Sequence, residues 1–120
     1  MPDADHAYTD WIEWPHARLR FVLDTNGTPS RFFIQLEYRV EDEWEPVVHF
    51  DHNPAAPDGH DITAEGLHMD IYRDGEQYRT KTDFPPVQLS VAPDYCETYI
   101  RKNADRLLRR YEQWHNLTTR

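Results

Sequence analysis

Hydrophobic and polar residues alternate over most of the first two thirds of the chain. The clearest run covers residues 31–40, where every second residue from Phe32 to Val40 is apolar or aromatic and the residues between them are mainly polar. This period of two predicts a β-strand with one buried and one exposed side. Similar runs over 18–24, 44–51, 67–73 and 77–82, with turn pairs at Asn26-Gly27 and Asp74-Gly75, predict a five-stranded antiparallel meander.

The last third of the chain changes to a helical period. Asp94, followed three residues later by Glu97, is typical of a helix start. From there the pattern predicts one helix over 94–115, with an apolar stripe made by Tyr95, Tyr99, Ile100, Ala104, Leu107, Leu108, Tyr111 and Trp114. A helix of this kind can cover one face of the meander, which predicts a two-layer α+β fold. We expect residues 1–120 to form a single domain, with residues 1–14 as a loose tail.

The composition adds an acidic surface to this picture. The chain has 120 residues with 13 Lys+Arg against 22 Asp+Glu, a formal net charge of −9, and only Lys81 and Lys102 are lysines. Such an acidic, lysine-poor chain is typical of halophilic proteins, in which salt screens the self-repulsion. The net charge also opposes simple electrostatic binding of nucleic acid, which requires a local basic face.

Cysteine usage and hydropathy predict a cytoplasmic protein. Cys96 is the single cysteine, so the chain has no internal disulfide and no cysteine pair with zinc-finger spacing. The sequence contains neither a signal-peptide pattern nor an apolar stretch of about 18 residues, so we expect no membrane association.

Histidine and aspartate concentrate on the side of the predicted sheet that the helix leaves open. In both His49-Phe50-Asp51 and His68-Met69-Asp70, the His and the Asp are two residues apart and therefore project from the same side of a strand, about 7 Å from each other. If these two strands pair, two His-x-Asp units meet. His52 and His60 fall in the intervening loop, residues 52–66, so four of the seven histidines lie within twenty residues.

A histidine beside a carboxylate suits general acid–base chemistry, and arginines on the same face suit phosphate. These residue types predict metal-independent RNA cleavage without a cofactor, in which one imidazole takes the 2′-hydroxyl proton, another protonates the leaving oxygen, and an arginine stabilises the charged phosphorane. The predicted catalytic residues are His49, Asp51, His68 and Asp70. The predicted substrate contacts are Arg20, Arg39, His52, His60 and Tyr72, and Arg79 is expected on the same face.

Two other interpretations fit the same residues. Cross-strand His/Asp and Arg/Glu pairs are ordinary stabilising contacts on an open sheet face, in which case the domain is a non-catalytic module that binds a partner protein or a second copy of itself. Alternatively, His49, Asp51, His68 and Asp70 supply a two-histidine, carboxylate set for a divalent metal, although the chain is short for the double-stranded barrel that usually carries such a set.

Three short segments carry a family resemblance. They are FDHNP at 50–54, GHDIT at 59–63 and GLHMD at 66–70, and with the C-terminal residues 105–110 and 112–114 they resemble a small uncharacterised family found mainly in haloarchaea. The resemblance covers roughly residues 31–117. It implies an archaeal source and brings no settled activity.

The aromatic-Asp-x-x-Pro segment is also similar to that of the TumE-type toxins of prokaryotic toxin–antitoxin systems. Phe50, Asp51 and Pro54 match that pattern, and His68 matches the first histidine of the downstream pair, with Asp70 where the second histidine stands. The resemblance implies a toxin-like ribonuclease with RNA as its substrate and an antitoxin-like protein as its partner.

Overall fold

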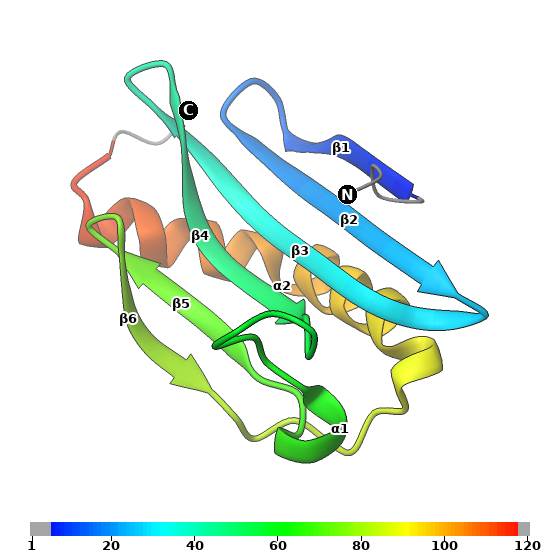
Figure 1. Cartoon of the computed structure of the whole chain (residues 1–120). Helices are drawn as coiled ribbons and strands as arrows, with labels where there is room; N and C mark the ends of the chain where they lie inside the picture. Colours follow the sequence, from blue (N-terminus) through cyan, green and yellow to red (C-terminus); the bar gives the residue numbers. More distant parts are fainter. Residues whose placement is uncertain (1–5, 118–120) are drawn as a thin grey trace.

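A computed structural model describes residues 6–117 as one antiparallel sheet with a long helix against one face (Figure 1). The strands follow one another in chain order: β1 (His6–Glu13), β2 (Ala17–Asn26), β3 (Thr28–Val40), β4 (Glu43–His52), β5 (Met69–Arg73) and β6 (Glu76–Lys81). The helices are α1 (Ile62–Glu65), the 3-10 turn η1 (Leu89–Val91) and α2 (Ala92–Trp114). The predicted α+β class and the long C-terminal helix are confirmed, but the predicted number of strands is wrong, because the sheet has six strands and not five.

The sixth strand is β1, which comes from residues expected to form a loose tail. It pairs with β2 in antiparallel register, with Tyr8 opposite Phe21. The Tyr8 and Phe21 rings stack at 4.8 Å between centroids, and the Tyr8 hydroxyl donates a hydrogen bond to Glu97 of α2. Arg101 of the same helix pairs with Asp10 at 2.9 Å. Polar side chains therefore make these contacts between β1 and α2. Because such contacts need no alternating apolar residues, the hydrophobic pattern did not predict this strand.

The core lies between the sheet and α2. The apolar members of the alternating strands face the helix and its apolar stripe, as the two-layer prediction requires. The buried residues at this interface include Leu19, Phe21, Phe32, Ile34, Leu36, Val48, Phe50, Met69 and Ile71 from the sheet, with Cys96, Ile100, Leu107, Leu108 and Tyr111 from α2.

The connection between β4 and β5 is long, and it brings His60 to the open face of the sheet, close to Asp51. It contains the single-turn helix α1, which Asp61 caps by accepting a hydrogen bond from the Thr63 amide. The Asn53 amide donates to the His60 carbonyl at 2.8 Å, so the loop closes on itself directly after β4. This closure returns residue 60 to the neighbourhood of Asp51.

No helix within residues 6–117 is long and apolar enough to cross a membrane.

Candidate functional site

The two His-x-Asp units meet on the open face of the sheet. His49 of β4 and Asp70 of β5 are directly opposite in the antiparallel register. The Nε2 atom of His49 lies 3.1 Å from Oδ2 of Asp70 and 3.8 Å from Oδ1 of Asp51. One imidazole therefore stands between two carboxylates from neighbouring strands.

The Asp70 carboxylate is buried and contacts three polar side chains. Its side chain is only 6% exposed. Thr80 and Gln77, from β6, donate hydrogen bonds to Oδ1 at 3.0 and 3.2 Å, and His49 contacts Oδ2. A buried carboxylate with this many partners has a fixed orientation, which is what a ligand or a catalytic group needs.

His49 is enclosed by aromatic rings and polar oxygens. Its ring centroid lies 5.1 Å from that of Phe33 and 5.2 Å from that of Tyr72, and its Nδ1 atom lies 3.3 Å from the side-chain oxygen of Gln35. Burial lowers the pKa of His49, while the charges of Asp51 and Asp70 oppose that shift. Burial also raises the pKa of Tyr72, so its phenol stays protonated at neutral pH.

The closed loop brings a second pair of histidines to the same place. The rings of His60 and His68 meet edge to face with centroids 4.2 Å apart, and Nδ1 of His60 lies 3.2 Å from Oε1 of Glu65. Gly59 permits this path, because a Cβ at that position would lie 1.9 Å from the backbone oxygen of Asn53.

Four side chains converge closely enough to share one ion. Asp51, His60, His68 and Asp70 each offer a nitrogen or oxygen atom, and these four atoms lie within 4.8 Å of one another. The Oδ1 atom of Asp51 is buried and makes no hydrogen bond within the described residues. Nε2 of His49 lies 3.8 Å from it, beyond hydrogen-bond distance, so this buried oxygen keeps its capacity to accept a hydrogen bond or to bind a cation.

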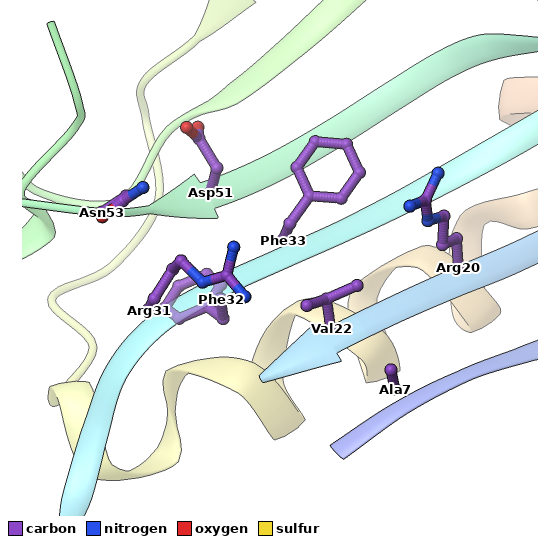
Figure 2. A pocket seen from close by; sticks show the side chains of 8 residues that line it. All are labelled: Ala7, Arg20, Val22, Arg31, Phe32, Phe33, Asp51 and Asn53. Carbon is purple, nitrogen blue, oxygen red and sulfur yellow. The ribbon is translucent and has the colours of Figure 1, made fainter. Parts of the chain in front are cut away.

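An open hollow of about 710 Å³ adjoins the cluster through Asp51. Figure 2 shows Asp51, Phe33 and Arg20 rising from β4, β3 and β2 on the same side of the sheet, with Phe33 between the other two. The Arg20 guanidinium lies 6.0 Å from the centre of the Phe33 ring and is the predicted substrate contact nearest to this hollow. A cation and an aromatic face beside the cluster suit an anionic ligand.

Three other residues that were predicted to contact substrate or to lie on the open face are not beside the cluster. His52 is 2% exposed on the helix side of β4, where its ring stacks on Phe32 and its Nδ1 atom accepts a hydrogen bond from the Ile62 amide. Arg39 lies near the far end of β3 and pairs with Asp42 at 3.1 Å. Arg79 faces α2, with its guanidinium 5.6 Å from the Trp114 ring, because it is opposite the core residue Ile71 in the sheet.

Sequence reasoning missed the residues that hold the cluster in place. Gln35, Gln77, Thr80 and Glu65 carry no pattern that distinguishes them from ordinary surface residues. Their positions become meaningful only once the strand register and the loop closure are known.

Comparison with known proteins places the chain in an uncharacterised family. A family model described as a domain of unknown function, DUF7718, matches residues 1–117. No curated protein and no solved structure matches the chain. The expectation of an uncharacterised family is thereby confirmed.

Proposed function

We propose that this chain, which belongs to the DUF7718 family, is a divalent-metal-binding protein whose ligands are Asp51, His60, His68 and Asp70. The observation that carries the proposal is the convergence of four ligand atoms within 4.8 Å of one another, together with a buried Asp51 oxygen that makes no hydrogen bond within the described residues. The sequence pattern indicates His49, Asp51, His68 and Asp70 as candidate metal ligands. In the proposed set of two imidazoles and two carboxylates, His60 replaces His49.

The spacing suits a first-row divalent ion. Metal–ligand bonds to nitrogen and oxygen are about 2.1 Å, so two ligands on opposite sides of an ion lie about 4.2 Å apart and tetrahedral neighbours lie closer. Small side-chain rotations bring atoms within 4.8 Å of one another into this range. Mixed imidazole and carboxylate ligands favour Zn²⁺, Fe²⁺ or Mn²⁺ over Mg²⁺, which prefers oxygen ligands and retains its waters.

The surrounding contacts support a preformed ligand set. Gln77, Thr80 and His49 orient Asp70, and Glu65 contacts Nδ1 of His60, which leaves Nε2 of that ring for an ion. A carboxylate on the far nitrogen of a ligating histidine is a common outer contact in metal sites, where it fixes the tautomer and the ring orientation.

The hollow beside Asp51 provides room for a substrate. A bound divalent ion supplies a Lewis acid that polarises an oxygen of the substrate or lowers the pKa of a water. Arg20 and Phe33 line the hollow and would hold an anionic group next to the ligands. Tyr72, whose ring lies 5.2 Å from that of His49 and whose phenol is protonated, would donate a hydrogen bond to such an anionic group.

Metal-independent RNA cleavage is the second candidate. The observation that favours it is the His49–Asp70 pair at 3.1 Å, on the same sheet face as Arg20. In this scheme His49 and His68 exchange protons with the substrate, while Arg20 contacts phosphate without Arg39. A toxin-like role and an antitoxin-like partner belong to this candidate and stay predictions, and the haloarchaeal source stays a prediction for either candidate.

For both candidates we propose a cytoplasmic location. Cys96 is a free, buried thiol, which suits a reducing compartment.

A pull-down from the native host tests whether a partner protein or a second copy of this chain binds the open face of the sheet.

Calorimetric titration of untagged, chelator-treated protein with Zn²⁺, Mn²⁺ and Mg²⁺ tests the metal proposal. We expect one equivalent of Zn²⁺ or Mn²⁺ to bind, weaker Mg²⁺ binding, and loss of the site in His60→Ala and His68→Ala. His6→Ala is the matched control, because His6 is an exposed histidine at the start of β1. Absence of Zn²⁺ and Mn²⁺ binding, or unchanged binding in both ligand variants, contradicts the proposal.

An RNA-degradation assay separates the two candidates. Cleavage that persists in excess chelator and disappears in His49→Ala and His68→Ala supports the second candidate. No cleavage under any condition removes the second candidate and leaves the calorimetric result unaffected.

A further inference from the structure

Four cationic side chains line one small pocket between the sheet edge and the long helix. Arg79 and Lys81 come from β6, and Arg106 and Arg110 come from α2. The pocket has a volume of about 260 Å³, and its apolar lining includes Met69, Ile71 and Leu107. This concentration of positive charge occurs in a chain whose net charge is −9.

Three of these four cations lack an acidic partner. Within residues 6–117, Arg79, Arg106 and Arg110 form no ion pair with a carboxylate, and Lys81 alone pairs with an acid, Asp83. Other arginines of α2 behave differently. Arg101 pairs with Asp10 and Glu97, and Arg109 pairs with Glu13 and Glu112.

Neutral aromatic residues contact the three arginines that lack an acidic partner. The Arg110 guanidinium lies 4.9 Å from the Trp114 ring, and that of Arg79 lies 5.6 Å from the same ring. Arg106 contacts the Tyr99 hydroxyl at 3.4 Å. Neither an aromatic face nor a neutral hydroxyl cancels the charge of a guanidinium group, so mutual repulsion among the three arginines persists.

Arg110 carries the strongest sign of an absent anion. Its Nε atom is buried and makes no hydrogen bond to any described residue. Burial lowers the pKa of Arg110, and the nearby charges of Arg79 and Arg106 lower it further. A buried guanidinium donor surrounded by like charges is costly unless a negative group satisfies it.

We infer that this pocket binds the phosphate group of a small molecule, through Arg79, Arg106 and Arg110. The planar guanidinium fork matches two phosphate oxygens at once, and several forks around one pocket suit a group of two negative charges. The pocket is smaller than typical sites for drug-sized ligands, about 300–1,000 Å³, so it accommodates free phosphate or the terminal phosphate of a phosphomonoester. This site is independent of the His/Asp cluster, because Arg79 faces α2 whereas the cluster lies on the open face.

Calorimetry with inorganic phosphate and phenyl phosphate, at constant ionic strength set with chloride, tests the inference. We expect either probe to bind the wild type, with affinity reduced at least tenfold in Arg110→Gln and in Arg79→Gln. The matched control is Arg101→Gln, which removes the same charge from α2 at a position already neutralised by Asp10 and Glu97. Tighter binding of phenyl phosphate identifies a phosphomonoester as the ligand, and equal binding identifies free phosphate.

Thermal unfolding without phosphate distinguishes binding from a structural role. Because removing one of three mutually repelling charges relieves repulsion, we expect Arg79→Gln to melt no lower than the wild type and to lose the phosphate-induced increase in melting temperature. The inference is overturned if neither probe binds more tightly than chloride, if Arg101→Gln weakens binding as much as Arg110→Gln does, or if an RNA oligonucleotide binds while both phosphate probes fail.

Discussion

The His49 ring lies 3.1 Å from the Asp70 carboxylate, directly across the β4–β5 ladder. The contact joins the two strands at the point where their open faces carry the proposed ligands Asp51 and Asp70. His49 is not one of the four convergent side chains, so in the metal proposal its contact with Asp70 orients a ligand and does not occupy the proposed metal position.

Replacing His49 should weaken metal binding without abolishing it. Loss of an outer-shell partner typically costs 10–100-fold in metal affinity, so we expect about that decrease for His49→Ala and a smaller one for His49→Gln, which retains an N–H donor. Calorimetry with Zn²⁺ measures both, and circular dichroism checks the fold. If His49→Ala loses the site as completely as His68→Ala, His49 is a ligand and the assignment of its role is wrong.

Gly59 should control the position of His60. A Cβ at residue 59 would lie 1.9 Å from the Asn53 oxygen, so Gly59→Ala must displace the loop that carries His60. We expect metal affinity to decrease roughly tenfold or more, as for a misplaced ligand, while the sheet signal in circular dichroism remains. Ala55→Gly, an exposed change in the same loop, serves as the control. Wild-type affinity in Gly59→Ala would exclude His60 from the ligand set.

The Tyr38 hydroxyl should contribute substantially to stability. It donates a 2.6 Å hydrogen bond to the buried Glu112 carboxylate of α2. Hydrogen bonds to charged groups contribute about 1.5–3 kcal/mol, so Tyr38→Phe should lower the free energy of unfolding by about that amount in urea titrations. Tyr95→Phe is the control, since Tyr95 packs against Phe84 through its ring and forms no side-chain hydrogen bond within the described chain. Equal losses in both variants would refute a special role for the Tyr38–Glu112 contact.

Cys96 should be unreactive in the folded protein. Its side chain is fully buried against the sheet, and burial raises the pKa of its thiol well above the ordinary value near 8.5. Because the thiolate is the reactive form, the rate of reaction with a disulfide reagent should stay near zero at neutral and mildly alkaline pH. The same reagent should label Cys96 rapidly in denaturant. Fast labelling of the native protein would show that α2 detaches from the sheet.

The periodicity of the sequence was sufficient to predict the two-layer fold but not the edge strand β1. Strands β2 to β4 and helix α2 bury regular apolar positions, and such patterns are read directly from the chain. The edge strand β1 buries little, and its contacts with α2 run through Tyr8, Asp10 and Glu13. Polar contacts between residues about ninety positions apart leave no local pattern, so the strand was expected to be a tail.

The candidate site was predictable only where strand alternation controls it. His49, Asp51 and Asp70 project from the expected face because the period of a strand is two. Arg79 does not, because β6 is offset from β5 by a bulge between Ile71 and Tyr72. The position of His60 depends on loop closure through Asn53, which no periodic pattern encodes.

Anomalous X-ray diffraction from crystals soaked in Zn²⁺ tests the central proposal most directly. We expect one dominant anomalous peak at about 2.0–2.2 Å from a side-chain atom of each of Asp51, His60, His68 and Asp70. No peak at this position, or a peak only at another histidine such as His6 or His16, would contradict the proposed metal site.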